Sequence, residues 1–90
     1  MGVRFSRHAY MRMLERGISS GEVIAALKRG ETIETYSRTH RWPCRLLLCE
    51  AAGRPLHVVV AEDPKARDII VVSAYRPDLR RWHPGYRRRR

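Results

Sequence analysis

The sequence predicts an α+β fold, in which two N-terminal helices pack on one face of a three- to four-stranded antiparallel sheet. A chain of 90 residues is long enough for one hydrophobic core. The segment before Gly30 holds two helix-length stretches, each with its own start and stop signals. After Gly30, the apolar residues follow the alternation and β-branched composition of strands. We therefore expect one domain over residues 1–80, followed by a basic tail over residues 81–90 that is disordered by itself.

Both predicted helices have a serine at the start and a glycine at the end. Ser6 opens the first helix, which runs to Arg16 and stops at Gly17. The run Ser19-Ser20-Gly21-Glu22 is a capping box for the second helix, which ends at Gly30. The connection between them is short enough to require a tight helix–helix corner.

Strand-length segments follow Gly30. Residues 3–5, before the first helix, are compatible with a short extra strand. Ala52-Gly53-Arg54 predicts a hairpin turn between two of these strands. Strand alternation places His57 on one face and its neighbours Leu56 and Val58 on the other. Since the helices cover one face of the sheet, the other face is expected to be free for a ligand. The predicted strands cover residues 32–36, 45–51, 56–62 and 69–75.

Charge is the most informative feature of the composition. Nineteen Lys and Arg residues oppose nine Asp and Glu residues, which gives a net charge of +10. Seventeen of these cations are arginine, whose planar guanidinium binds phosphate bidentately and stacks on bases. We therefore expect a polyanionic partner, nucleic acid first. An arginine-rich proteome would explain the arginine-to-lysine ratio but not the net charge, and an acidic protein partner is a third interpretation.

Several classes of function are not supported by the sequence. No apolar run approaches the ~18 residues of a membrane span, and no signal peptide is seen, so we expect a cytoplasmic protein without membrane contact. Cys44 and Cys49 are expected to be buried free thiols. The histidines and carboxylates lack metal-ligand spacing, and no glycine-rich phosphate loop occurs. We expect neither a metal nor a cofactor.

The first helix carries three residues that share one stripe. His8, Arg12 and Arg16 are four residues apart, so successive members are rotated by only about 40° around the helix. A solvated basic face, partly neutralised by Glu15, would give the same pattern, and periodicity alone leaves the two interpretations open.

Three blocks of the sequence resemble one known family. The blocks read Ser6-x-His8-Ala9-x-x-Arg12-Met13-x-Glu15-Arg16-Gly17-Ile18, Gly53-Arg54-Pro55-Leu56-His57-Val58-Val59 and Val72-x-x-Tyr75-x-Pro77-Asp78, with Gly30 and Trp82 at matching places. Together they cover nearly the whole chain and resemble small bacterial proteins known as domain of unknown function 4258. That family is similar to RelE-like, barnase-like and colicin-nuclease-like toxins. The dense basic end over residues 87–90 departs from the family pattern.

The resemblance implies metal-independent RNA cleavage, in which the 2′-hydroxyl of the RNA attacks the phosphate. Such a reaction needs a base, an acid and cations for the transition state. His8 and His57 are the candidate proton carriers. The cations are Arg12, Arg16 and Arg76, with Tyr75 as a proton donor or a group that orients a base. The candidate catalytic residues are therefore His8, Arg12, Arg16, His57 and Tyr75.

Two segments, residues 38–43 and 80–83, combine arginines with a tryptophan. Such a composition suits the binding of unpaired bases, which stack on aromatic rings beside cations. Each tryptophan would equally serve to cap the edge of a small core. The candidate nucleic-acid-binding residues are Arg38, Arg41, Trp42, Arg45, Arg76, Arg80, Arg81, Trp82 and Arg87.

The leading hypothesis is a toxin-like, metal-independent endoribonuclease that acts on free or ribosome-bound RNA and is controlled by an acidic antitoxin protein. The alternatives are a non-catalytic nucleic-acid-binding module and a basic interaction domain for an acidic partner protein. The sequence leaves the oligomeric state undetermined.

Overall fold

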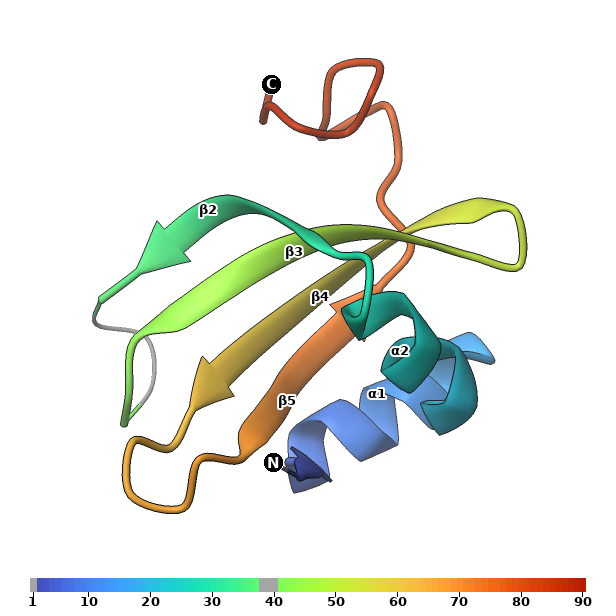
Figure 1. Ribbon diagram of the computed structural model, residues 1–90. Coiled ribbons are helices and arrows are strands. Elements are labelled where there is room, and N and C mark those ends of the chain that lie inside the picture. Colours follow the sequence, from blue (N-terminus) through green and yellow to red (C-terminus); the bar gives the residue numbers. More distant parts are fainter. Residues whose placement is uncertain (1, 38–40) are drawn as a thin grey trace.

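The computed structural model describes residues 2–37 and 41–90 and has the α+β architecture expected from the sequence (Figure 1). Two helices lie on one side of a single sheet, and the C-terminal segment lies on the other side. The helices are α1 (Arg7–Arg16) and α2 (Ser20–Leu27). The strands are β1 (Val3–Phe5), β2 (Glu31–Tyr36), β3 (Cys44–Ala51), β4 (Arg54–Glu62) and β5 (Ile69–Tyr75).

The predicted N-terminal capping signals of both helices are confirmed, but α2 ends at Leu27 with Lys28 as its C-cap, earlier than the predicted end at Gly30. The Ser6 side chain accepts a hydrogen bond from the backbone of Ala9, and Ser19 accepts one from the backbone of Glu22. These bonds satisfy backbone donors that have no partner within the helix. Gly17 ends α1 with a φ of 67°, a left-handed conformation that favours glycine.

The sheet has five strands in the order β1-β5-β4-β3-β2, one more than expected, and it is mixed rather than antiparallel. β1 pairs parallel to β5, and every other pairing is antiparallel. A three-residue strand has too few residues to show a period, and its partner lies at the other end of the chain. The sequence could therefore suggest a strand at residues 3–5 but not its parallel pairing.

The main core lies between the sheet and the helices. Burial of each valine, leucine, isoleucine or methionine side chain in this core stabilises the fold by about 1.5–3 kcal/mol. Its members come from both layers: Ala9, Met13, Ile18, Val23 and Ala26 from the helical region, and Leu47, Cys49, Leu56, Val58, Val60, Val71 and Ala74 from the sheet. Cys44 and Cys49 are both buried free thiols, as predicted.

Two β-bulges decide which side chains face away from the helices. In β5 the register shifts opposite Val59 and Val60, so Val71 and Ala74 both pack into the helix-side core. Simple alternation along β5 would put Val71 and Tyr75 on the same face, but the bulge separates them. Tyr75 instead pairs with His57 on the opposite face of the sheet.

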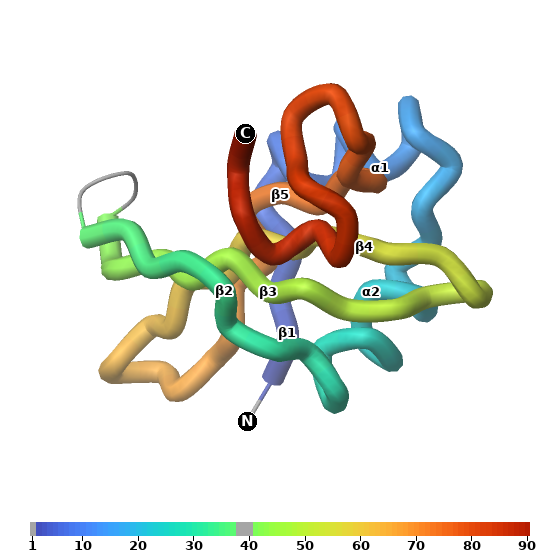
Figure 2. The backbone as a smooth tube through the Cα atoms, turned by 90° about the horizontal axis from the view of Figure 1, so that it is seen from above, coloured from blue at the N-terminus to red at the C-terminus, as the bar shows by residue number. Residues whose placement is uncertain are grey.

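That opposite face is not free, because residues 81–90 fold back over it (Figures 1 and 2). Trp82 and Arg89 form an antiparallel bridge, and the backbone of His83 donates to the carbonyl of Arg88. Gly85 turns the loop with a φ of 90°. The sequence predicted a tail that is disordered by itself; in the structure, residues 81–90 make these contacts on the sheet. Trp82 is buried against the sheet, and this burial orders the segment.

Candidate functional site

His57 and Tyr75 form the polar centre of the sheet face that the C-terminal segment covers. They are paired residues of β4 and β5, and Nδ1 of His57 lies 3.1 Å from Oη of Tyr75. Nε2 of His57 lies 2.9 Å from the backbone oxygen of Tyr86. A carbonyl oxygen only accepts, so Nε2 carries a proton and donates it. In the neutral ring Nδ1 is then the acceptor, and the phenol of Tyr75 donates to it.

The histidine of this pair is buried, whereas Tyr75 is half-buried. His57 is 0% exposed, and its ring meets the Trp82 indole edge-on with centroids 4.4 Å apart. Desolvation lowers the pKa of His57 and raises the pKa of Tyr75. At neutral pH the imidazole is therefore uncharged and the phenol holds its proton.

Two ion pairs fasten the C-terminal segment to β2. Arg87 and Arg89 bind Glu31 and Glu34 through paired hydrogen bonds of 3.0–3.1 Å. Arg89 also donates to the hydroxyl of Tyr36, which in turn donates to Glu34. Burial acts to raise the pKa of Glu34, but the hydrogen bonds from Arg89 and Tyr36 outweigh it and lower that pKa.

A bulge in β2 makes this fastening geometrically feasible. The register shifts between Thr32 and Glu34, so that Glu31 pairs with Leu48 and Glu34 pairs with Leu46. Residues 46 and 48 lie on one face of β3, and the bulge brings both glutamates to that same face. Without it, a separation of three residues would have turned one glutamate toward the helices.

An open pocket of about 710 Å³ lies beside Tyr75, and arginines dominate its lining. α1 contributes Arg16, whose guanidinium donates to the carbonyl of Ala74 at 2.8 Å, beyond the end of the short strand β1. Within residues 2–37 and 41–90, the side chain of Arg81 makes no hydrogen bond or ion pair. The complete lining is Arg16, Tyr75, Arg76, Pro77, Asp78, Arg80, Arg81, Trp82 and Arg89. This pocket can therefore accept an anion.

The predicted catalytic residues do not all meet at this pocket. Arg16, His57 and Tyr75 come together, but His8 lies on the exposed side of α1 and does not line the pocket. Arg12 is also exposed and forms an ion pair with Glu15 at 3.1 Å. Of the predicted stripe on α1, only the last residue, Arg16, therefore lines the pocket.

Two of the predicted nucleic-acid ligands have structural contacts instead. The guanidinium of Arg76 binds Glu22 at 2.9 Å and also donates to the carbonyls of Ala51, Arg54 and Pro55. It thereby ties β5 to α2 and to the β3–β4 hairpin. Trp82 is 2% exposed, with the guanidinium of Arg89 4.7 Å from its ring centre. The indole of Trp82 contacts the His57 ring and the Arg89 guanidinium, so it does not present an open surface on which a base could stack.

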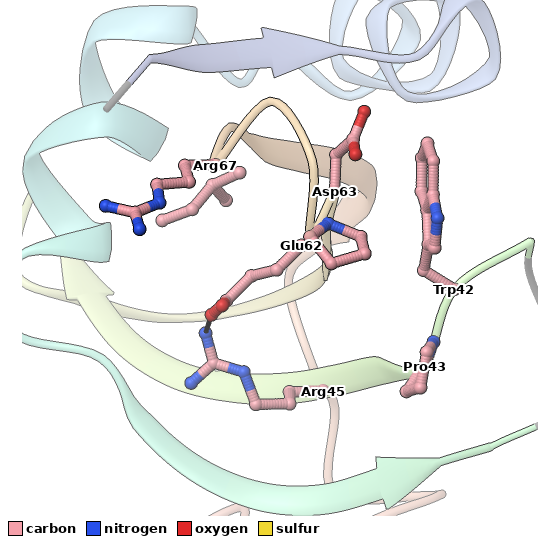
Figure 3. Close-up of a pocket in the computed structure, with 8 residues that line it drawn as sticks. Trp42, Pro43, Arg45, Glu62, Asp63 and Arg67 are labelled. Atoms are coloured by element: carbon pink, nitrogen blue, oxygen red, sulfur yellow. Dashed lines mark hydrogen bonds and ion pairs between the residues drawn. The ribbon is translucent and has the colours of Figure 1, made fainter.

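The other arginine–tryptophan segment lies at the far end of the strands, in a second open pocket of about 770 Å³ (Figure 3). Arg45 pairs there with Glu62 at 2.5 Å, while the indole of Trp42 stands across from Asp63. The guanidinium of Arg41 lies 5.2 Å from the centre of the Trp42 ring. Arg38 falls outside the described residues. The structure thus separates the predicted nucleic-acid ligands into two regions.

The surface is positively charged even after internal pairing. Among the described residues, every carboxylate except Glu50 forms an ion pair with an arginine. Exposed cations without an ion pair in this part of the chain include Arg7, Arg54, Arg67, Arg81 and Arg88. The unpaired charge is therefore almost entirely positive.

Sequence reasoning missed four residues of the covered face: Glu34, Tyr36, Tyr86 and Arg89. The turn dipeptide Pro84-Gly85 signals a chain reversal that would return the tail toward the sheet. The two-residue spacing of Arg87 and Arg89 is the second signal, since extended residues two apart face the same way.

Two further features of the described residues bear on the site. No group of three or more His, Cys, Asp and Glu side chains in them is arranged to hold a metal ion. No helix among them is long and apolar enough to cross a bilayer.

The comparisons with known proteins identify a family. The model of the domain of unknown function DUF4258 matches residues 5–76. No significant match to this chain is found among the curated proteins or among the solved structures. Because the matched region covers most of the chain and includes α1, α2 and all of β2–β5, the chain belongs to the DUF4258 family.

Proposed function

We propose that this DUF4258 protein is a small, metal-independent endoribonuclease of the toxin-like type. The observation that carries the proposal is the Tyr75 phenol, which lines an arginine-rich pocket and is hydrogen-bonded to a neutral histidine behind it. A phosphate held by the arginines would lie next to a group that can pass a proton to a buried acceptor.

The proposed reaction transfers one proton along a short relay. The 2′-hydroxyl of a ribose gives its proton to Oη of Tyr75, while Tyr75 gives its own proton to Nδ1 of His57. The 2′-oxygen attacks the adjacent phosphorus to form a 2′,3′-cyclic phosphate, and the bond from phosphorus to the 5′-oxygen breaks. The 5′-oxygen takes a proton from water, and His57 returns its extra proton to solvent through Tyr75. Tyr75 is the catalytic residue in this scheme, and His57 is a positioning and relay residue.

The surrounding groups support each state of the relay. The carbonyl of Tyr86 fixes the His57 tautomer and would stabilise the imidazolium that forms. Arg16 and Arg81 line the same pocket and would stabilise negative charge on the phosphate, as cations aimed at a developing oxyanion do. These groups supply the chemistry without a metal ion.

The test uses purified protein, total RNA and EDTA, with Tyr75→Phe as the paired variant. We expect the parent protein to release fragments with 2′,3′-cyclic phosphate ends, and Tyr75→Phe to lose about 10²–10⁴-fold in rate. RNA affinity of the variant should stay within about twofold, because the phenol hydroxyl contributes little charge. Absence of cleavage by the folded parent protein, including with ribosome-bound messenger RNA, would refute the proposal.

A second candidate function is a non-catalytic RNA-binding module. The full burial of His57, with both ring nitrogens engaged, favours it, because a histidine in this setting also serves simply to bind two strands and a loop. This function predicts salt-sensitive RNA binding by the parent protein and by Tyr75→Phe alike, with no cleavage by either.

The excess positive charge also supports an acidic protein partner, of the antitoxin kind expected for a toxin-like enzyme. The arrangement of two helices before the antiparallel strands β2–β5 supports a relationship to the RelE-like and barnase-like or colicin-nuclease-like folds. A structure of the protein bound to its partner, compared with those folds, would test both points.

A further inference from the structure

The helical side of the molecule exposes an unusual amount of apolar surface. Among the described residues, every exposed large hydrophobic side chain except Leu79 lies on α1 or α2. Leu14 is 68% exposed, Tyr10 57% and Met11 54%. Isolated exposed apolar residues are common on protein surfaces, but several on adjacent turns form a patch that signals a binding site.

Of the exposed side chains on the helices, Tyr10, Leu14 and Ile24 border a groove between α1 and α2, whereas Met11 does not. The groove has a volume of about 280 Å³, and it is more enclosed by apolar side chains than the arginine pocket. Tyr10 and Leu14 line it from α1, Ile24 lines it from α2, and Phe5 and Ile18 complete its apolar lining. The two helices that line the groove lie on the side of the sheet away from the C-terminal segment (Figure 1).

The charges around the groove are positive. Arg7 precedes Tyr10 by three residues and Leu14 by seven, so it lies on the same side of α1. Arg7 is exposed, and it forms no ion pair within the part of the chain that the structure describes. The nearby carboxylates are already neutralised, since Glu15 pairs with Arg12 and Glu22 pairs with Arg76. A partner with carboxylates beside its apolar groups would complement this surface.

We propose that the α1–α2 groove docks an acidic amphipathic helix of another protein. Apolar side chains spaced by three, four and seven residues on that helix would fill the groove between Tyr10, Leu14 and Ile24, as in other helix-in-groove complexes. Its Asp and Glu residues would lie beside Arg7. An extended segment would instead pair with a sheet edge, and the edge strand beside the groove, β1, is only three residues long.

A second copy of this chain is the less suitable occupant. Each copy carries a net charge of +10, and a self-association through this face would bring Arg7 of each copy toward the other. Electrostatic repulsion therefore opposes a dimer at the groove but favours an acidic helix there.

The test is a selection from a displayed library of helical peptides that have a fixed apolar stripe and randomised Glu or Lys elsewhere. The full-length protein is the bait, and Leu14→Ser is used for counter-selection. We expect enriched peptides to be acidic and to bind the parent protein at least tenfold more tightly than Leu14→Ser. Leu79→Ser, which changes an exposed leucine outside the groove, is the matched control and should bind like the parent.

Three results would overturn the proposal. The first is failure to enrich any peptide over the Leu14→Ser counter-selection, and the second is enrichment of basic peptides. The third is a dimer of the parent protein in sedimentation equilibrium that Leu14→Ser abolishes, because the occupant would then be a second copy. Circular dichroism and a thermal melt of both variants, compared with the parent, verify that the selection compares folded proteins.

Discussion

The phenol of Tyr75 and the imidazole of His57 meet at 3.1 Å on paired residues of β5 and β4, on the sheet face opposite the helices. The hydrogen bond from Nε2 of His57 to Tyr86 sets the direction of this contact, since it leaves Nδ1 as the acceptor. Strands β4 and β5 and the loop that carries Tyr86 therefore together determine which nitrogen of His57 carries the proton.

The two candidate histidines should differ in their effect on RNA cleavage. We expect His8→Ala to keep at least half of the parent rate, because His8 is exposed on α1 and does not line the pocket. His57→Gln should lose about 10²–10⁴-fold, because the relay loses its proton acceptor.

The pH profile of cleavage separates this role of His57 from a purely structural one. His57 must be neutral to accept a proton, and desolvation lowers its pKa from 6.5. The parent rate should therefore persist below pH 6.5 and fall only at more acidic pH. The residual rate of His57→Gln should lack that fall. An equal loss of rate in His8→Ala, or an unchanged profile in His57→Gln, would contradict the relay.

Stability should also depend on pH through His57. Because burial lowers the pKa of His57 in the folded state, the unfolded chain takes up a proton at higher pH than the folded chain. The free energy of unfolding should then fall as pH drops below about 6.5, by at most about 1.4 kcal/mol per pH unit for one proton. Urea denaturation of the parent protein and of His57→Gln at several pH values from about 7 to about 5 measures this difference. Parallel curves for the two proteins would contradict it.

The Glu34–Arg89 ion pair should contribute measurably to holding the C-terminal segment. A double-mutant cycle with Glu34→Ala and Arg89→Ala should give a coupling of about 0.5–1 kcal/mol, a modest value because the Arg89 side chain is 55% exposed. The matched cycle with Glu31→Ala and Arg87→Ala should give a smaller coupling, since both partners are more than half exposed. Equal couplings would show that burial of Glu34 does not strengthen its pair.

RNA binding should depend on arginines that have no carboxylate partner. Arg81→Ala should reduce the slope of log K against log salt by about 0.7, the value for one phosphate contact on a single strand. Arg87→Ala should leave the slope nearly unchanged, because that guanidinium already binds Glu31. Binding titrations of a short single-stranded RNA at several salt concentrations give both slopes. A larger change for Arg87 than for Arg81 would place the RNA beside Arg87 and Glu31 instead of at the arginine pocket.

Much of the fold could be predicted because its signals are local. The serine caps, the left-handed Gly17 and the Ala52-Gly53 turn depend on neighbouring residues, and each is present in the structure. The alternation in β4 correctly placed His57 opposite Leu56 and Val58, since that strand has regular pairing with β3. The candidate site was harder to predict. Of the α1 stripe, only Arg16, the last residue of the helix, bonds to β5 and lines the pocket, because Arg12 and His8 lie about one and two turns away from that end.

The sequence by itself determined the helix starts, the four long strands, the family and the net charge, since these follow from nearest neighbours and composition. Tertiary structure alone decided which faces the side chains of β2 and β5 occupy. A bulge adds one residue to a strand, and the packing of the opposing strand selects where it forms. Tertiary structure also decided the place of the basic tail. Seventeen arginines look alike in a sequence, and only the folded chain pairs Arg87 and Arg89 with carboxylates while it leaves Arg81 unpaired at the pocket.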